Sequence, residues 1–231
     1  MKTFTTAIVS AVCLLAISQT CPAAEEDGFK SIFDGKTLEG WGGKEQFWSV
    51  EDGAITGRTT KENPTKGNTF IIWKEGELKD FELKMKFRIV GGNSGIQIRS
   101  KDLGNNVVGG YQADFDAGNG WTGSLYEEKG RGILAKRGNK VEITADGKKK
   151  NAGTTTPEKE IVESVEKEGW NEYHIIAKGN QLTFKVNGLT TIELSDNQSD
   201  KAATSGILAL QLHQGPPMTV QFKDIQLKEL K

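Results

Sequence analysis

Alternation of apolar and polar residues with a period of two is the feature that most constrains this chain. In Phe81 to Phe87 every second residue is apolar, and the residues between them are Glu or Lys. Side chains of a β-strand alternate between its two faces, so such a segment packs one face on a core and leaves the other in water. Comparable segments recur roughly every 8 to 12 residues, with turn signals between them. The pattern predicts an all-β fold.

Turn signals bound these segments and leave little room for helix. Asp52-Gly53 is typical of a two-residue hairpin turn, since glycine takes a positive φ without steric penalty. Pro157 to Lys167 has helical spacing, and we expect a short helix there with Thr156 as its N-cap. Asp146 to Pro157 is polar and contains glycine, which indicates a loop. No repeat or linker divides the chain, so the expected fold is one all-β domain, a β-sandwich or jelly roll.

The first 24 residues have the composition of a secretory signal peptide. Lys2 precedes a short apolar run, and small residues follow before an acidic stretch. The run is too short for a stable membrane span. Ser18 does not match the aliphatic residue expected before a lipid-anchored cysteine, which disfavours an anchor at Cys21. We therefore expect residues 1–24 to be removed, residues 25–231 to form one domain, and the mature protein to be secreted or periplasmic.

The charge balance argues against polyanionic partners. Removal of residues 1–24 takes away Lys2 and leaves 29 Lys and Arg against 31 Asp and Glu, a net charge of −2. A chain this close to neutral has no overall field that attracts nucleic acid or an anionic membrane. Both cysteines, Cys13 and Cys21, fall in the removed segment, so the mature protein is expected to depend on its core and not on disulfides.

Residues 91–138 hold most of the polar side chains that folding alone does not require. Gln97 and Arg99 share one face of a strand, and Gln112 and Asp114 share one face of the next. If Arg99 pairs opposite Gln112 and Gln97 opposite Asp114, these side chains form one patch, with Cβ atoms roughly 5 Å apart. Further residues suited to sugar rings and hydroxyls follow along the chain: Trp121, Tyr126, Glu127, Glu128 and Arg131.

Two interpretations of this patch stay open. The outer face of a sheet is also polar, but the outward face of Phe81 to Val90 carries Glu, Lys and Arg, whereas the patch carries amides and aromatic groups. Arg99 could equally form a structural ion pair with Asp114. Gln211 and His213 share the polar phase of a later strand and are added as candidates for the same site.

The order of short motifs resembles the 3-keto-disaccharide hydrolase domain family along nearly the whole mature chain. The motifs include FDGKTLEGW, WSVEDGAITG, NSGIQIRS, GYQADF, TGSLYEE and GILALQLHQG. The resemblance implies a concanavalin-like jelly-roll β-sandwich of two antiparallel sheets, with a ligand groove on the concave sheet. It also implies a secreted hydrolase or lyase that acts on glycosides whose glucose ring carries a ketone at C3.

This resemblance implies a stepwise elimination. The ketone acidifies the proton on C2, a base removes that proton, the glycosidic oxygen leaves C1, and water adds to the enone. The reaction needs a base, a donor at the leaving oxygen and stabilisation of the enolate. The catalytic candidates are Arg99, Asp114, Glu127, Glu128 and His213, and the substrate-binding candidates are Gln97, Gln112, Trp121, Tyr126, Arg131 and Gln211. Many members of the family have Glu where this chain has Gln112, so Asp114, Glu127 or Glu128 is the expected base.

Two other functions remain open at this point. One is a non-catalytic carbohydrate-binding module of lectin-like fold. The other is a conventional glycosidase whose paired carboxylates would be Asp114 with Glu127 or Glu128. The expected partner is an oligosaccharide or a keto-sugar in each case, with no nucleic acid and no membrane span. No cofactor is certain, although Asp114, Asp116 and Glu127 could hold a divalent cation through oxygen ligands.

Overall fold

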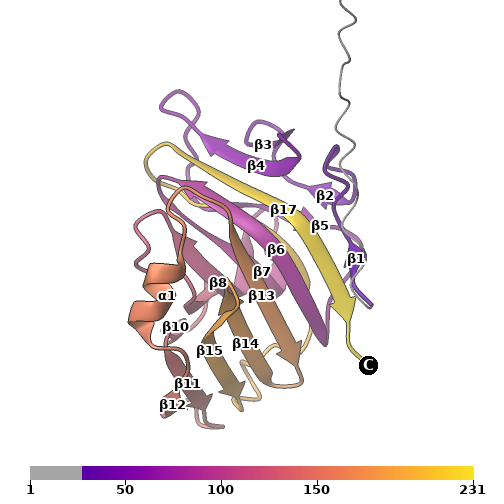
Figure 1. The fold of residues 1–231 in the computed structure, drawn as a ribbon. Coiled ribbons are helices and arrows are strands. Elements are labelled where there is room, and N and C mark those ends of the chain that lie inside the picture. The colour runs from indigo at the N-terminus through magenta and orange to yellow at the C-terminus, as the bar shows by residue number, and fades with distance from the viewer. Residues whose placement is uncertain (1–27) are drawn as a thin grey trace, which may run out of the picture.

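The computed structural model describes residues 28–231, which form two stacked β-sheets (Figure 1). The signal peptide predicted for residues 1–24 lies outside the described residues. The prediction of an all-β jelly roll is confirmed, and α1 (Glu158–Ser164) is the one α-helix of the described part of the chain. No helix within residues 28–231 has the length and apolar character needed to cross a bilayer.

The larger sheet has ten strands in the order β12-β11-β15-β14-β13-β6-β17-β4-β3, and β1 pairs with β17. Its strands are β1 (Lys30–Ser31), β3 (Trp48–Glu51), β4 (Ala54–Thr59), β6 (Phe81–Val90), β11 (Asn139–Ile143), β12 (Lys149–Thr154), β13 (Asn171–Lys178), β14 (Gln181–Val186), β15 (Leu189–Asp196) and β17 (Met218–Glu229). The pairing of β11 with β15 is parallel, whereas β17 pairs antiparallel with both β4 and β6. In Figure 1, β17 crosses this sheet between those two strands.

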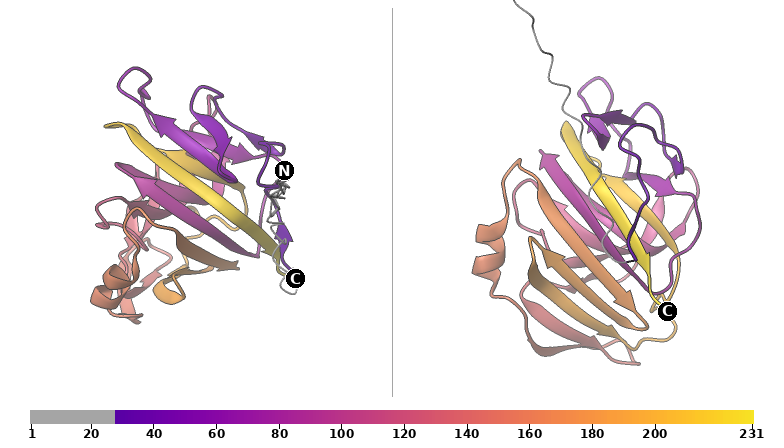
Figure 2. Two further views of the ribbon diagram at one scale, coloured as in Figure 1. Left: turned by 45° about the horizontal axis from the view of Figure 1, so that its top comes forward. Right: turned by 45° about the vertical axis from the view of Figure 1, so that its right-hand side comes forward.

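The smaller sheet has seven strands in the order β10-β9-β8-β7-β16-β5-β2, all paired antiparallel. Its strands are β2 (Trp41–Gly42), β5 (Thr69–Trp73), β7 (Asn93–Asp102), β8 (Val108–Asp116), β9 (Leu125–Glu128), β10 (Gly132–Ala135) and β16 (Ile207–Leu212). Figure 2 shows the two layers from two further sides, with α1 outside both sheets.

The core lies between the facing sides of the two sheets. Phe87 of β6 and Phe115 of β8 come from different sheets, and their ring centroids are 4.2 Å apart. Phe222 of β17 packs edge-on against Phe115, at 5.9 Å between centroids. The hydroxyl of buried Tyr173 in β13 donates across the core to the backbone carbonyl of Asp114, at 3.1 Å. These contacts fix β8 against the larger sheet, and β8 carries the centre of the site described below.

Two local predictions are wrong in part. The expected loop Asp146 to Pro157 contains the strand β12, whose residues are all exposed. It pairs with β11 at the edge of the sheet and needs no apolar face, so no alternation marks it. The predicted helix is present, but it begins at Glu158 with Pro157 in the N-cap position, which Thr156 was expected to occupy.

Candidate functional site

A groove of about 510 Å³ lies on the face of the smaller sheet that is turned away from the core. Six of the predicted site residues line it: Gln112, Asp114, Trp121, Tyr126, Glu128 and His213. Its other lining residues are Asn68, Gly92, Asn93, Asp116 and Ile133. The alternation of β8 brings this about, because Tyr111, Ala113 and Phe115 are buried in the core and the residues between them face the groove.

The pairing of β7 with β8 differs by two residues from the predicted register. Gln97 lies opposite Gln112, and Gly95 lies opposite Asp114. The prediction carried an unbroken alternation through Arg99, but the register shifts between Ile98 and Lys101. A β-bulge there inserts a residue into one strand and inverts the alternation beyond it.

Arg99 is therefore not in the groove, and its prediction as a catalytic residue facing Asp114 is wrong. Arg99 has a φ of 45°, and its guanidinium is turned to the other side of the sheet. It donates to the carbonyl oxygens of Lys79 (2.6 Å) and Gly179 (2.7 Å), and it forms an ion pair with Asp80 at 2.9 Å. With a side chain only 1% exposed, Arg99 joins loops from both sheets and is a structural residue.

Glu127 and Arg131 are also placed away from the groove, contrary to prediction. In the short strand β9, Tyr126 and Glu128 take the groove phase, so Glu127 points to the opposite side, where it pairs with Tyr111. Arg131 donates to both oxygens of Glu127, each at 2.8 Å, and to Asp196 at 2.6 Å. Burial alone would lower the pKa of Arg131, but these hydrogen bonds raise it above its ordinary value. The cluster links β9 to β15 of the larger sheet.

Asp114 is a buried carboxyl group of the groove, and its pKa is raised. It is 7% exposed, and burial raises its pKa to about 7, against the lowering effect of hydrogen bonds from Asn93 and Gln112. Asn93 Nδ2 lies 3.1 Å from Oδ1 of Asp114, and Gln112 Nε2 lies 3.3 Å from the same oxygen. Within residues 28–231, Oδ2 has no side-chain donor. A carboxylate with this pKa can take up and release a proton at neutral pH, as a general base must.

Gln97 and Gln211 lie on the same face as the groove but beneath its surface. Both are fully buried, and neither lines the groove. Gln97 Nε2 donates to Gln112 Oε1 at 2.7 Å, whereas neither side-chain polar atom of Gln211 has a hydrogen-bond partner among the described residues. The structure thus gives neither residue the direct substrate contact that was predicted.

Trp121 stands on a glycine-rich loop that is fixed from both sides. The carboxylate of Asp116 accepts hydrogen bonds from the backbone N–H groups of Gly120 and Trp121, at 3.1 and 2.7 Å. Arg137 also holds the loop: it donates to the carbonyl oxygen of Asn119 at 2.8 Å and forms an ion pair with Glu158 of α1 at 3.1 Å. The indole is 41% exposed at the groove, so a rigid aromatic surface is available for a sugar ring.

The predicted cation site does not fit the groove. Glu127 lies on the far side of its strand, and both carboxylate oxygens of Asp116 already accept backbone hydrogen bonds. Among the described residues, no group of three or more His, Cys, Asp or Glu side chains is arranged to hold a metal ion. Asp114 thus lacks the two partners with which it was expected to bind a cation.

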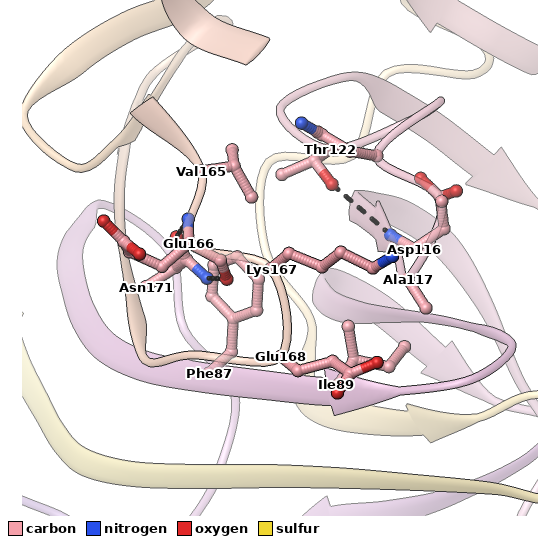
Figure 3. A pocket seen from close by; sticks show the side chains of 12 residues that line it. Phe87, Ile89, Asp116, Ala117, Thr122, Val165, Glu166, Lys167, Glu168 and Asn171 are labelled. Carbon is pink, nitrogen blue, oxygen red and sulfur yellow. Dashed lines mark hydrogen bonds between the residues drawn. The ribbon is translucent and has the colours of Figure 1, made fainter. Parts of the chain in front are cut away.

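A second cleft, of about 220 Å³, lies on the other side of the Trp121 loop (Figure 3). Phe87 and Ile89 line one side of it, and the loop that begins at Asp116 lines another. Thr122 Oγ1 accepts a hydrogen bond from the backbone N–H of Asp116 at 3.4 Å, which braces the loop between the two hollows. Of the residues that the structure describes, only Asp116 lines both hollows.

Sequence reasoning missed two amide residues of the groove. Asn93 lies on the same strand face as Gly95, two residues before it, and the alternation extended backwards would have found it. Asn68 precedes β5 in a polar loop and carried no such signal. Its Nδ2 lies 3.5 Å from Glu128 Oε1, and its Oδ1 accepts a hydrogen bond from the backbone N–H of Gln214 at 3.0 Å, next to His213.

The chain is related to known carbohydrate-active proteins in sequence and in fold. The family model of the 3-keto-alpha-glucoside-1,2-lyase-like domain matches residues 28–228. A 3-keto-disaccharide hydrolase of Bacteroides thetaiotaomicron is 36% identical over 99 residues, which cover 36% of this chain and 33% of that protein. The chain thus matches about a third of the length of this relative.

Two solved structures share the fold. A putative glycosyl hydrolase of Parabacteroides distasonis has a TM-score of 0.58 at 21% identity, over 87% of this chain and 99% of that one. The carbohydrate-binding module CBM66 of Bacillus subtilis has a TM-score of 0.55 at 16% identity, over 82% of this chain and 96% of that one. At such identities the likeness shows a shared jelly-roll architecture.

Proposed function

Because the chain belongs to the 3-keto-alpha-glucoside-1,2-lyase-like family, we propose that it is a carbohydrate-active, hydrolase-like enzyme that cleaves 3-keto-glycosides with Asp114 as the base. The observation that carries the role of Asp114 is its place in the groove, with a pKa raised to about 7 by burial and with no side-chain donor to Oδ2 among residues 28–231. We also propose export of the mature protein, on the basis of the composition of residues 1–24.

The proposed reaction begins when Asp114 takes the proton from C2 of the sugar. The electron pair of that C–H bond forms a C2–C3 double bond and places negative charge on the C3 oxygen, which gives an enolate. When the C3 carbonyl re-forms, the electron pair moves to make the C1–C2 double bond, and the glycosidic bond at C1 breaks. The leaving oxygen then takes up a proton, for which Glu128 and His213 are the groove residues of suitable chemistry. Water adds to C1 of the resulting enone and completes a net hydrolysis.

We propose that neutral hydrogen-bond donors stabilise the enolate. In the described part of the chain, the residues that line the groove include three carboxylates and no Lys or Arg. The hydroxyl of Tyr126 and the side-chain amide of Asn93 are among the groove groups that can donate to an oxygen that gains charge, and fixed donors in a partly dehydrated site are effective in this role. Trp121 provides the aromatic surface on which the ring can stack.

The test incubates the mature protein with 3-keto-trehalose, trehalose and a polysaccharide. Turnover of the keto-sugar alone, lost in Asp114→Asn and kept in the exposed control Asp200→Asn, is the expected result. Loss of a general base typically costs about 10² to 10⁴ in rate. Binding without turnover of any of the three would instead indicate a carbohydrate-binding module, and cleavage of trehalose or the polysaccharide would indicate a conventional glycosidase.

A further inference from the structure

A chain of buried polar side chains runs beneath the groove and ends at Asp114. Ser100 Oγ donates to Gln97 Oε1 at 2.7 Å, and Gln97 Nε2 donates to Gln112 Oε1 at 2.7 Å. Gln112 Nε2 then lies 3.3 Å from Asp114 Oδ1. Ser100 belongs to this chain because the bulge that turns Arg99 away brings its neighbour onto the groove face.

The direction of these hydrogen bonds is set by chemistry. An ionised carboxylate can only accept, so Gln112 must present its NH₂ group to Asp114 and its oxygen to the other side. That oxygen needs a donor, which Gln97 provides, and the oxygen of Gln97 is the nearest acceptor of the Ser100 hydroxyl, at 2.7 Å against 3.0 Å for the carbonyl oxygen of Ile98. Each amide is thereby held in one of its two orientations.

Gly95 makes room for this arrangement. A Cβ atom at Gly95 would lie 2.3 Å from Cγ and 2.4 Å from Cδ of Gln112, because the Gln112 side chain lies over the β7 backbone at that position. Gln97 is 0% exposed and does not line the groove, so a ligand in the groove does not contact it directly.

We propose that Gln97 and Ser100 are positioning residues that act on Asp114 through Gln112, holding Oδ1 on the sheet side so that Oδ2 faces the substrate. The inference rests on the proposed role of Asp114 as base. It replaces the predicted role of Gln97 in substrate binding with a role in fixing the geometry and charge of the base.

The other groups around Asp114 make its two amide donors important. Asp116 follows on the same strand, Glu128 and Tyr126 face it from β9, and His213 lies after β16. Tyr173 packs below and donates to the Asp114 backbone. Among the described residues, the groove lining contains no Lys or Arg. Hydrogen bonds from Asn93 and Gln112, with a smaller contribution from the backbone N–H of Phe115, therefore oppose the effect of burial on the pKa of this carboxylate.

Substitution of Gln97 tests the inference. In Gln97→Glu the introduced carboxylate cannot donate to Gln112 Oε1, so the Gln112 amide is expected to turn its oxygen towards Asp114. The acidic limb of kcat/KM should then move upward by about one pH unit, the size of a lost hydrogen bond to a charged group, with little change in KM. Gln97→Met should give a smaller shift in the same direction.

Gln211→Met is the matched control for the pH limb. It removes a glutamine of equal burial from the same sheet face, but one whose amide has no partner among the described residues, so the acidic limb of kcat/KM should stay in place.

Carbon-13 NMR titration of the Asp114 carboxyl in the substrate-free protein provides a second readout that needs no turnover. An unchanged titration in Gln97→Glu overturns the inference. A shifted titration in a protein that turns over no keto-sugar overturns the proposed function and leaves the hydrogen-bond chain established.

Discussion

Replacement of Arg99 by methionine separates a structural role from a catalytic one. The guanidinium forms three hydrogen bonds of 2.9 Å or less, to Lys79, Gly179 and Asp80. Arg99→Met keeps much of the side-chain volume but leaves these buried acceptors without their donor. Breaking a buried pair costs about 3–5 kcal/mol, and the 25% exposure of Asp80 places this case at the lower end, about 3 kcal/mol. For a chain of this size that corresponds to a fall in Tm of about 6–12 °C.

The assay follows thermal unfolding by circular dichroism and keto-sugar turnover well below Tm. We expect Tm to fall as stated while kcat per folded molecule stays within about twofold of the wild type. Arg99→Met should couple energetically with Asp80→Asn and add independently to Asp114→Asn. A loss of about 10² to 10³ in kcat with an unchanged Tm would refute the reasoning, because that is the signature of a lost oxyanion donor.

Three further outcomes follow from the groove. Asp114→Asn should match the wild type in stability near pH 4 and exceed it at pH 8 by up to about 4 kcal/mol in urea unfolding, because a folded pKa of about 7 against 3.8 makes the wild type lose stability as pH rises between those values. An equal stability at both pH values would contradict this. Trp121→Ala should raise KM about tenfold with kcat nearly unchanged in steady-state kinetics, and a fall in kcat alone would count against stacking. Because three carboxylates line the groove, a keto-sugar bearing a carboxylate should bind more weakly than its neutral counterpart in calorimetry. Glu128→Gln should reduce this difference in affinity between the two sugars. Equal affinities for the two sugars in the wild type would argue against this prediction.

Period-two alternation predicted the fold and the part of the site that depends on strand phase alone. Gln112 and Asp114 reach the groove because β8 alternates without interruption beneath them. The face on which Arg99 lies could not be predicted, because the bulge lies among polar residues, where a break in the apolar alternation leaves no trace in the sequence. In β9, a strand of only four residues, adjacent Glu127 and Glu128 differ in phase, and no periodicity in so short a segment says which of the two faces the groove.

The pairing register could not be read from the sequence either. Before the bulge, the predicted and observed registers differ by two residues, which preserves the face of each side chain there and so leaves the hydrophobic pattern equally satisfied. Contacts made only in the folded chain distinguish them, above all Gln112 lying over Gly95. The pKa of Asp114 is likewise a product of tertiary burial, which local sequence does not encode.

The central claim is that Asp114 removes the proton on C2 of a 3-keto-glycoside. Its most direct test compares turnover of a 3-keto-glycoside carrying deuterium at C2 with that of the protiated substrate, in the wild type. If C–H cleavage by Asp114 limits the rate, the deuterated sugar reacts more slowly, and its deuterium is absent from the enone released on the way to product. Equal rates, with deuterium retained at C2 of the product, would contradict the account.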